Sequence, residues 1–298
     1  MKKMLFVMNP YSGKKRANKV LVEILQIFNE ADYAIQIHMT SCSGDATRVV
    51  KELAPGLDLV VCCGGDGTFN ETVAGLIQSG VDIPVGYIPA GSTNDFAASL
   101  GLSADPITAA KDIVQGKPSR YDAGNFGGRF FSYVASFGAF TKTSYTTPQS
   151  IKNALGHTAY VLSGISELSQ IRKEHIRLEA DGEIIEDDFL FGAICNSTSV
   201  GGILTLDPKQ VDMADGLLEI LLVRSPQNLL EIPECIAAVQ SQNYNDCAMI
   251  TFRSARQIRI FADPEMDWTL DGEWEKGHEE VVVSNTHLAY QLMQPERK

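Results

Sequence analysis

The chain has 298 residues, 44% of them hydrophobic, and a formal net charge of −12. This length suffices for one large or two medium-sized domains with a buried core. The acidic balance argues against broad nucleic-acid binding, and no apolar run reaches the roughly 18 residues of a transmembrane helix. The start, "MKKMLFVMNPYSG", is expected to form a first strand rather than a signal peptide, because its apolar run is short.

The first 120 residues alternate between strand and helix patterns. Continuous apolar runs suit strands buried on both faces, and the segments between them carry apolar residues at helical spacing. Strands are predicted over 4–10, 33–41, 57–63 and 84–92, and helices over 14–31, 44–54, 69–80, 95–102 and 107–116. This alternation predicts a doubly wound, mostly parallel sheet.

Beyond residue 120 the pattern becomes rich in strands. A hairpin is expected over 120–138, further strands over 176–197, 217–224, 248–262, 266–275 and 279–286, and inserted helices over 147–171 and 226–242. Most of these strands are expected to pair as antiparallel hairpins. We therefore place an α/β domain at 1–122 and a β-rich domain at 123–286, and expect the tail 287–298 to pack back on the first domain.

The six cysteines form no CxxC pair and have no histidine at a metal-ligand spacing. We expect reduced thiols in a cytoplasmic protein, mostly acting as small core residues. They are Cys42, Cys62, Cys63, Cys195, Cys235 and Cys247.

The segment "CCGGDGTFNE" (62–71) places Gly64, Gly65 and Gly67 between a strand and a helix. Glycine allows a ligand close to the backbone, and the N–H groups at a helix start suit a phosphate. The spacing matches neither GxxxxGK[ST] nor GxGxxG. Asp66 would repel a phosphate unless a cation lies between them, which indicates Mg²⁺. The alternative is a tight turn in which Asp66 caps the helix.

Three other glycine-containing loops follow predicted strands: "NPYSGKK" (9–15), "TSCSGDA" (40–46) and "PAGSTNDFA" (89–97). The carboxyl ends of parallel strands meet at one edge of an open α/β sheet, which is where such sheets bind ligands. All four loops are therefore expected to contribute to one site.

Together, "GGDGTFNE", "NPYSGK", "GSTNDFA" and "LDGE" resemble the diacylglycerol kinase catalytic family, in its soluble bacterial lipid-kinase form. That family is related to the sphingosine kinases and, more distantly, to the NAD kinases and phosphofructokinases. The resemblance covers nearly the whole chain in order. It implies an NAD-kinase-like α/β domain followed by a β-sandwich-rich domain. GGDGT is shared with NAD kinases, whereas Asn70-Glu71 and the GSTNDF segment favour the lipid-kinase side.

The resemblance also implies the cofactors ATP and Mg²⁺, with ATP in the cleft between the two domains. Backbone N–H groups near the glycines would hold the phosphates. The positions that match the family's ATP-binding residues are Asn9, Pro10, Tyr11, Ser12, Gly13, Thr40, Gly64, Gly65, Asp66, Gly67, Thr68, Phe69, Asn70, Glu71 and Ser92.

The segment "WTLDGEWE" (268–275) carries the predicted chemistry. Phosphoryl transfer to an alcohol needs a carboxylate within reach of the hydroxyl proton, and the resemblance makes Asp271 this general base. It also places Glu273 with Asp95 and Asp66 in an acidic network around the Mg²⁺. The residues alone leave open an Asp-Gly hairpin turn without a catalytic role.

The segment "VDMADGLLEILLV" (211–223) resembles the family's structural magnesium loop. The matching positions are Asp212, Asp215 and Leu217, of which Asp215 would supply a side chain. The chain has Ala214 where the family often has an acid, and the loop is slightly long. An Asp-Gly turn that opens a strand is the alternative.

The family's acceptor is a lipid that is recognised at a membrane surface. The apolar segment 147–171 and the cations Arg172, Lys173 and Arg177 suit an anionic bilayer surface; the alternative is an ordinary packed helix with a solvated charged end.

We therefore expect a cytoplasmic, peripherally membrane-associated kinase that converts diacylglycerol to phosphatidic acid. A sphingoid base, another lipid alcohol or NAD as acceptor, and a non-catalytic nucleotide-binding regulator, are the alternatives. No nucleic-acid partner is expected, and an exposed sheet edge of the second domain could form a homodimer by pairing across a two-fold axis.

Overall fold

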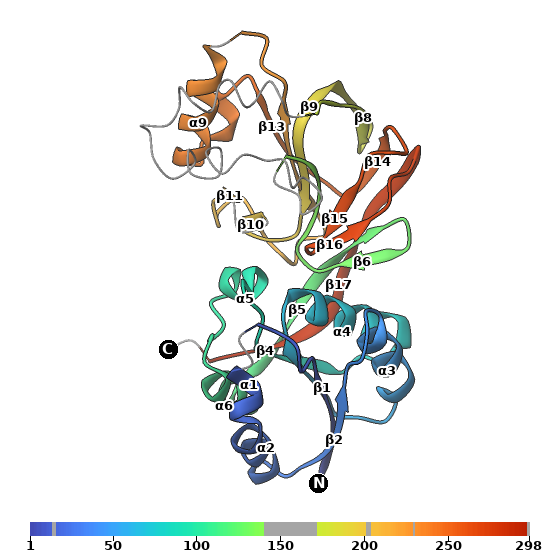
Figure 1. Cartoon of the computed structure of the whole chain (residues 1–298), viewed down its shortest axis with the longest axis vertical. Coiled ribbons are helices and arrows are strands. Elements are labelled where there is room, and N and C mark those ends of the chain that lie inside the picture. Colours follow the sequence, from blue (N-terminus) through green and yellow to red (C-terminus); the bar gives the residue numbers. More distant parts are fainter. Residues whose placement is uncertain (14–15, 140–171, 201–203, 229, 297–298) are drawn as a thin grey trace. The chain divides into compact units, whose positions relative to one another are not determined.

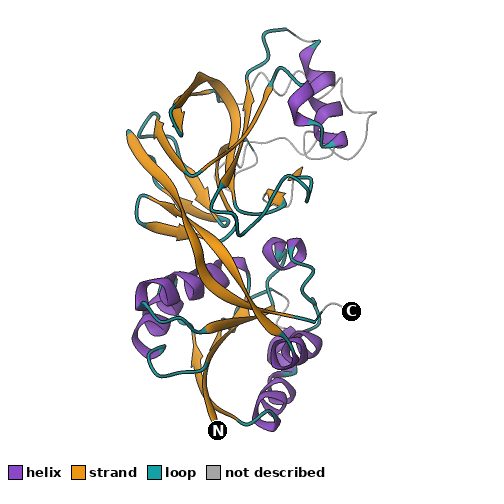
Figure 2. Cartoon of the chain, turned by 180° about the vertical axis from the view of Figure 1, so that it is seen from behind, coloured by secondary structure: helices purple, strands orange, loops and turns teal. Residues whose placement is uncertain are grey.

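The structure is a computed structural model that describes residues 1–13, 16–139, 172–200, 204–228 and 230–296. The chain divides into two compact units (Figures 1 and 2). The first unit contains Met1–Ala123 and Thr286–Lys298, and the second contains Gly124–Asn285. The chain thus enters the second unit once and returns from it once.

The first unit is built on a parallel sheet in the order β17-β4-β3-β1-β2. Its strands are β1 (Lys2–Met8), β2 (Tyr33–Met39), β3 (Leu59–Gly64), β4 (Pro84–Pro89) and the end of β17 (Glu280–Gln294). Every neighbouring pair runs parallel. The predicted doubly wound, mostly parallel sheet is confirmed.

Helices cover both faces of this sheet (Figure 1). One side carries α1 (Arg16–Lys19), α2 (Leu21–Glu30) and α6 (Pro106–Gln115), and the other carries α3 (Asp45–Leu53) and α4 (Asp66–Ser79). The short α5 spans Asp95–Ser99. Because both faces are covered, five successive residues of β1, Met4 to Met8, are buried. None of the described helices combines the length and apolar character needed to span a bilayer.

The adjacent cysteines of β3 show this two-sided burial. Cys63 belongs to the core cluster that contains Phe28 of α2 and Ile113 of α6, whereas the Cys62 thiol hydrogen-bonds Thr72 of α4. Burial raises the pKa of the Cys63 thiol to about 12. All six cysteines are free thiols, as expected, and five of them are buried.

The second unit is built from antiparallel strands in the order β16-β15-β7-β9-β8-β14-β17; β12 also pairs with β9, and β13 pairs with β12. They enclose a core cluster around Phe137, Ile220 and Trp268. The strands are β5 (Lys117–Phe126), which begins in the first unit, β6 (Arg129–Phe131), β7 (Val134–Gly138), β8 (Glu174–Ala180), β9 (Glu183–Cys195), β12 (Leu218–Arg224), β13 (Ile250–Ala255), β14 (Gln257–Phe261), β15 (Trp268–Leu270) and β16 (Glu273–Glu275).

Smaller elements complete this unit: β10 (Ser199–Val200), β11 (Leu204–Thr205), α9 (Glu231–Ser241) and a 3-10 helix over Tyr244–Asp246. The predicted helix over 226–242 begins only at Glu231, and the Leu230 N–H before it donates to the Asn228 side chain. The predicted helix 147–171 lies outside the described residues.

Strand β17 is longer than the predicted strand 279–286, because the backbone bends rather than ends there. Leu288 has a left-handed φ of +49°. The fully buried Asp122 carboxylate accepts the Leu288 N–H and contacts His287 Nδ1 at 3.0 Å. The strand then continues beside β4 through Gln291 and Leu292.

Candidate active site

Three of the predicted loops meet at the carboxyl ends of β1, β3 and β4. The Asn9 N–H donates to the Cys63 carbonyl at 3.0 Å, and the Asn9 side-chain amide donates to Thr68 Oγ1 at 3.2 Å. The Ala90 N–H donates to the Gly64 carbonyl at 2.7 Å. The structure therefore brings together the segments 9–13, 64–71 and 90–95.

Glycine is required here because the loops pack directly on one another. A Cβ on Gly13, whose φ is +49°, would lie 2.4 Å from the Ala90 carbonyl oxygen. A Cβ on Gly91 would lie 2.7 Å from the Gly65 Cα, and one on Gly64 would collide with the Thr68 side chain. The close approach that the glycines predicted is thus, first of all, an approach of protein to protein.

Asp66 is turned toward the start of α5 rather than along α4. Its Oδ2 accepts the Asp95 N–H at 2.9 Å, and its Oδ1 accepts the Tyr87 hydroxyl at 3.3 Å. Burial raises the pKa of Asp66, and the nearby Asp95 charge adds to this rise. Burial also raises the pKa of Asp95. The alternative in which Asp66 caps the helix after the glycines is therefore wrong, because α4 has no side-chain cap and the Asp66 carboxylate instead accepts an N–H at the start of α5.

The Asp66 and Asp95 pair fits a divalent cation chemically. Two neighbouring carboxylates that are partly buried favour neutralisation, either by protons or by a hard cation with oxygen ligands. The sequence did not indicate a role for Tyr87, whose hydroxyl donates to the Asp66 carboxylate and helps to orient it. Its ring stacks on Phe69, which in turn stacks on Phe96, with centroid distances of 4.4 and 5.0 Å.

The remaining predicted residues of this unit lie around the same edge. Thr40 follows β2 and is buried, with its N–H donating to the Met8 carbonyl. Ser92 is exposed and follows Gly91, whose N–H and carbonyl both bond the side chain of Asn94. Asn94 itself adopts a left-handed φ of +56°. It is a loop-forming residue that the sequence analysis quoted without assigning a role.

The "LDGE" segment forms the hairpin turn between β15 and β16. Asp271 and Gly272 both have positive φ, +48° and +82°, as a two-residue turn of type I′ requires. Only 3% of Asp271 is exposed. Its carboxylate accepts the N–H groups of Ser132, Tyr133 and Val134. Three backbone donors stabilise an anion and fix its orientation.

Glu273 follows this turn and is paired with a residue that sequence analysis missed. Arg129 on β6 donates to the Glu273 carboxylate at 2.9 Å, to Glu275 at 2.8 Å and to the Trp274 carbonyl at 3.1 Å. A lone arginine between an Asn-Phe-Gly-Gly turn and a phenylalanine pair gave no signal of this role.

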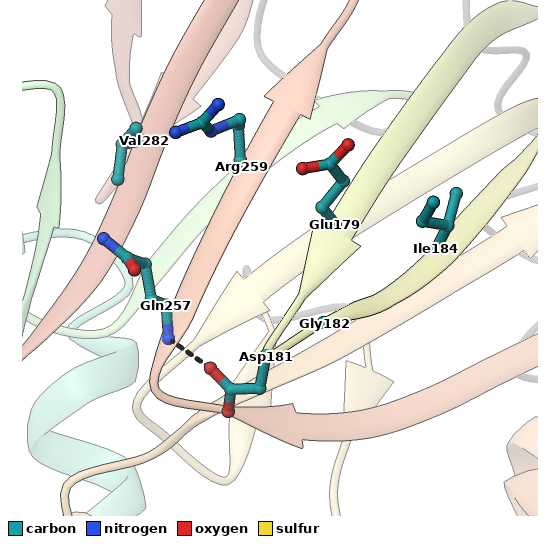
Figure 3. Close-up of a pocket in the computed structure, with 7 residues that line it drawn as sticks. All are labelled: Glu179, Asp181, Gly182, Ile184, Gln257, Arg259 and Val282. Carbon is teal, nitrogen blue, oxygen red and sulfur yellow. Dashed lines mark hydrogen bonds between the residues drawn. The ribbon is translucent and has the colours of Figure 1, made fainter.

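A second Asp-Gly-Glu tripeptide occupies the turn between β8 and β9. Asp181 and Gly182 have φ of +46° and +95°, and the Asp181 carboxylate accepts the N–H groups of Arg256 and Gln257. This turn is exposed and lies at an open pocket of about 510 Å³ (Figure 3). The tripeptide and its turn therefore do not identify a catalytic acid by themselves, and burial distinguishes Asp271 from Asp181.

The four predicted catalytic acids are divided between the units. Asp66 and Asp95 belong to the first, and Asp271 and Glu273 to the second. Within the described parts of the chain, no group of three or more His, Cys, Asp or Glu side chains is arranged to hold a metal ion. The predicted acidic network remains a prediction.

In the second predicted metal loop, the carboxylates cap their own turns. Asp212 accepts the Ala214 N–H at 3.0 Å, and Asp215 accepts the Leu217 N–H at 2.9 Å. Such Asx turns are what the turn alternative describes. The metal site at Asp212, Asp215 and Leu217 stays a prediction.

The predicted basic cluster is largely compensated by acids. Arg172 pairs with Glu174 and Asp263, and Arg177 pairs with Glu179. Ion pairs reduce the charge that these side chains present to an anionic surface, which favours the alternative of a solvated end.

Comparison with known proteins matches both units. Residues 3–126 match the diacylglycerol kinase catalytic domain, and residues 136–287 match a YegS C-terminal, NAD-kinase beta-sandwich-like domain. A diacylglycerol kinase of Bacillus subtilis (strain 168) is 34% identical over 92% of this chain and 90% of its own length. One of Staphylococcus epidermidis (strain ATCC 12228) is 30% identical over 92% and 86%. The crystal structure of a diacylglycerol kinase from Bacillus anthracis str. Sterne has the same fold, with a TM-score of 0.75, 23% identity and coverage of 99% and 97%.

Proposed function

Because this chain belongs to the diacylglycerol kinase family and is a lipid-kinase phosphotransferase, we propose that it transfers the γ-phosphoryl group of ATP to diacylglycerol, giving phosphatidic acid. The observation that carries this proposal is the convergence of segments 9–13, 64–71 and 90–95 beside the start of α4. A helix start with nearby glycine loops suits a polyphosphate.

The first unit binds the nucleotide in this proposal. Gly65 is the N-cap residue of α4 and has no side chain that could bond the helix start, so backbone N–H groups of the first turn can face the phosphates. Asn9 and Thr68 hold the two loops at a fixed spacing. The sequence-predicted ATP contacts of Tyr11, Ser12 and Ser92 lie on these loops and extend the site toward solvent.

Asp66 and Asp95 would hold Mg²⁺, directly or through water. When bound, this ion would neutralise charge on the transferred phosphoryl group. Tyr87 and the Asp95 N–H orient the Asp66 carboxylate for this purpose.

The second unit supplies the general base. Asp271 accepts the proton of the lipid hydroxyl while the hydroxyl oxygen bonds to the γ-phosphorus. The bond from the γ-phosphorus to the bridging oxygen breaks, and ADP leaves with the electron pair. The N–H groups of Ser132, Tyr133 and Val134 hold the carboxylate in one orientation.

We further propose that the acceptor is met at an anionic membrane surface by a cytoplasmic enzyme. Diacylglycerol resides in a bilayer, so the enzyme must meet this acceptor at a membrane surface. Trp274, which is 58% exposed and adjacent to Glu273, offers an amphipathic ring of the kind found at membrane interfaces.

An acceptor panel tests the proposal. The wild-type protein is incubated with γ-labelled ATP and Mg²⁺ in anionic mixed micelles that contain diacylglycerol, a sphingoid base, another lipid alcohol or NAD. Label is expected in phosphatidic acid, and it should vanish when Mg²⁺ is chelated. Label in a different product would show that the corresponding compound, and not diacylglycerol, is the acceptor. Nucleotide binding without transfer to any acceptor would support a regulator instead.

A further inference from the structure

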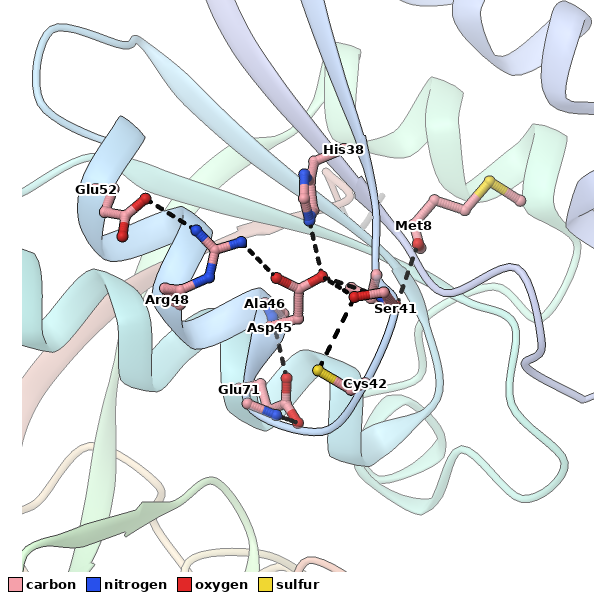
Figure 4. A network of polar contacts seen from close by, with 11 residues as sticks. Met8, His38, Ser41, Cys42, Asp45, Ala46, Arg48, Glu52 and Glu71 are labelled. Carbon is pink, nitrogen blue, oxygen red and sulfur yellow. Dashed lines mark hydrogen bonds and ion pairs between the residues drawn. The ribbon is translucent and has the colours of Figure 1, made fainter.

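The loop between β2 and α3, residues 41–46, is held by two carboxylates from different directions (Figure 4). We call it the α3 entry loop. It directly follows Thr40, a predicted nucleotide contact, and it packs beside α4, whose start is the predicted phosphate site. The loop lies within "TSCSGDA" (40–46), one of the four loops that the sequence predicted to contribute to one site.

The first carboxylate is that of Glu71 on α4. Its Oε1 accepts the Gly44 N–H at 2.6 Å and contacts Ser43 Oγ at 3.3 Å, and its Oε2 accepts the Ala46 N–H at 3.1 Å. The Thr47 hydroxyl adds a bond to the Glu71 carbonyl. The N–H groups at the start of α3 are therefore already occupied by an anion of the protein itself.

The second carboxylate is that of Asp45, which is only 6% exposed. It accepts the N–H and the hydroxyl of Ser41, at 3.0 and 3.2 Å, and it pairs with His38 and Arg48. Asp45 thus ties the loop to β2 and α3, whereas Glu71 ties it to α4.

This arrangement connects the loop to the phosphate turn through a short series of contacts. Glu71 lies one helical turn after Thr68, and Thr68 bonds the Asn9 side chain. Thr40 bonds the Met8 carbonyl, immediately before Asn9. A shift of the entry loop would therefore displace Thr40 and the Asn9 loop relative to the start of α4.

We propose that Glu71 and Asp45 are positioning residues for nucleotide binding. Glu71 fills the start of α3, so that phosphate binds at the start of α4 and not at α3, and both carboxylates fix Thr40 beside that site. The inference rests on the proposed function for its nucleotide. It assigns Glu71 an action through the entry loop, in place of a direct contact of its side chain with ATP.

The first measurement uses protein without nucleotide. Amide hydrogen exchange at Gly44 and Ala46 is compared in the wild type, Glu71→Ala, Glu71→Gln and Glu52→Ala. Exchange is expected to rise at least about tenfold in Glu71→Ala, because the two N–H groups lose their acceptor. Glu71→Gln should be intermediate, since one amide oxygen remains. Glu52 is an exposed residue of α3 paired with Arg48, and its removal should leave both amides unchanged.

The second measurement is the Kd of Mg·ATP by calorimetry, together with kcat and KM. Glu71→Ala should weaken Mg·ATP binding about tenfold and raise KM for ATP more than it changes kcat, with partial recovery in Glu71→Gln. Asp45→Asn should reproduce this loss, because it loosens the same loop from the other side. If Asp45→Asn fails to fold, His38→Ala removes one Asp45 partner and serves in its place.

These results separate the possible readings. We call the bonds of the Glu71 and Asp45 carboxylates to the α3 entry loop the clamp. Unchanged amide exchange in ligand-free Glu71→Ala would show that the clamp does not exist. Loosened amides with unaltered ATP affinity in both Glu71→Ala and the Asp45 or His38 variant would show that the clamp has no part in nucleotide binding. A loss of affinity in Glu71→Ala alone would make Glu71 a direct ligand and overturn the inference. A wild type that binds no nucleotide contradicts the proposed function, while the exchange data still decide whether the clamp exists.

Discussion

At the scale of single residues, glycine shows what a sequence can and cannot specify. The position of Gly64, Gly65 and Gly67 between a strand and a helix predicted that a ligand comes close to the backbone. The structure shows protein atoms close to Gly64 and Gly65, and the approach of a ligand stays a prediction. The residues around these glycines did not indicate which other segment of the chain would pack against them. Gly91 meets Gly65 across two loops that are 26 residues apart in sequence, and such pairing depends on the finished sheet.

The first prediction concerns Gly91→Ala. Its Cβ would lie 2.7 Å from the Gly65 Cα and 2.6 Å from Asn94 Oδ1, so the two loops must move apart. We expect a loss of about 1–3 kcal/mol in the free energy of unfolding, measured in urea, and weaker Mg·ATP binding by calorimetry.

The matched control is Gly56→Ala, where a Cβ meets no atom within 4 Å but φ is +84°. It should lose about 1–2 kcal/mol through backbone strain alone and keep its nucleotide affinity. If Gly91→Ala behaved like this control in the binding assay, the loop contact would be irrelevant to the site.

The two Asp-Gly-Glu tripeptides show that the burial of an acid also depends on distant parts of the chain. Both form tight turns with positive φ at Asp and Gly, and both aspartates accept backbone N–H groups. Only Asp271 is buried, because residues 132–134 fold over it from a distant part of the chain. No local pattern distinguishes the two turns, and the family resemblance supplied the choice between them.

At the scale of elements, type was predicted better than boundaries. The helix expected from residue 69 begins at Asp66, because Gly65 takes the N-cap position and Gly67 lies inside the helix. The helix expected over 14–31 is divided, since Val20 has non-helical backbone angles between α1 and α2. The entry loop was expected to contribute to the ligand site, whereas its anchor at Glu71 is a tertiary contact that the local sequence does not indicate.

The second prediction follows from Asp45 at the start of α3. Hydrogen bonds from His38, Arg48 and Ser41 hold the pKa of this carboxyl well below its ordinary value of 3.8. A lowered folded-state pKa gives stability that is present above pH 3.8 and is lost as the pH falls below it. Asp45→Asn should therefore reduce the urea midpoint near neutral pH, and the difference from wild type should shrink on acidification.

A difference between Asp45→Asn and wild type that stays constant from neutral pH to below pH 3.8 would show that the charge of Asp45 contributes nothing. Asp58→Asn serves as a comparison, because Asp58 is an exposed acceptor of the Lys3 N–H without a cationic partner in that bond.

The third prediction concerns the bend in β17. Asp122→Ala removes the buried acceptor of the Leu288 N–H and the partner of His287. Leu288 is the residue with the left-handed backbone at the bend. An unpaired buried donor costs about 1–3 kcal/mol. The urea midpoint should fall accordingly, and amide exchange of Leu288 should rise. Unchanged exchange at Leu288 would contradict this account of the bend.

At the scale of the whole molecule, sequence alternation was enough to predict a parallel α/β domain followed by antiparallel strands, and the family comparison agrees with both. The sequence did not predict that β17 would serve both units. Its first part pairs with β14 in the second unit and its last part with β4 in the first. A strand pattern reports burial, and burial alone does not name the partner strand.

The proposed reaction uses both units, because the nucleotide loops lie in one and the candidate base in the other. Asp271→Asn should therefore keep its affinity for Mg·ATP while losing turnover. Asp181→Asn is its matched control, since it alters the same tripeptide in the same type of turn at an exposed site. Urea unfolding of both variants shows whether the loss of a backbone acceptor has unfolded the second unit.

The most direct measurement is the transfer of labelled γ-phosphoryl from Mg·ATP to diacylglycerol in anionic mixed micelles by these three proteins. The account predicts labelled phosphatidic acid from wild type and Asp181→Asn, and a loss of at least about a hundredfold in Asp271→Asn, the order expected for removal of a general base. Wild-type turnover in a folded Asp271→Asn variant would contradict the assignment of the base. The absence of labelled phosphatidic acid from the wild type itself would contradict the proposed reaction.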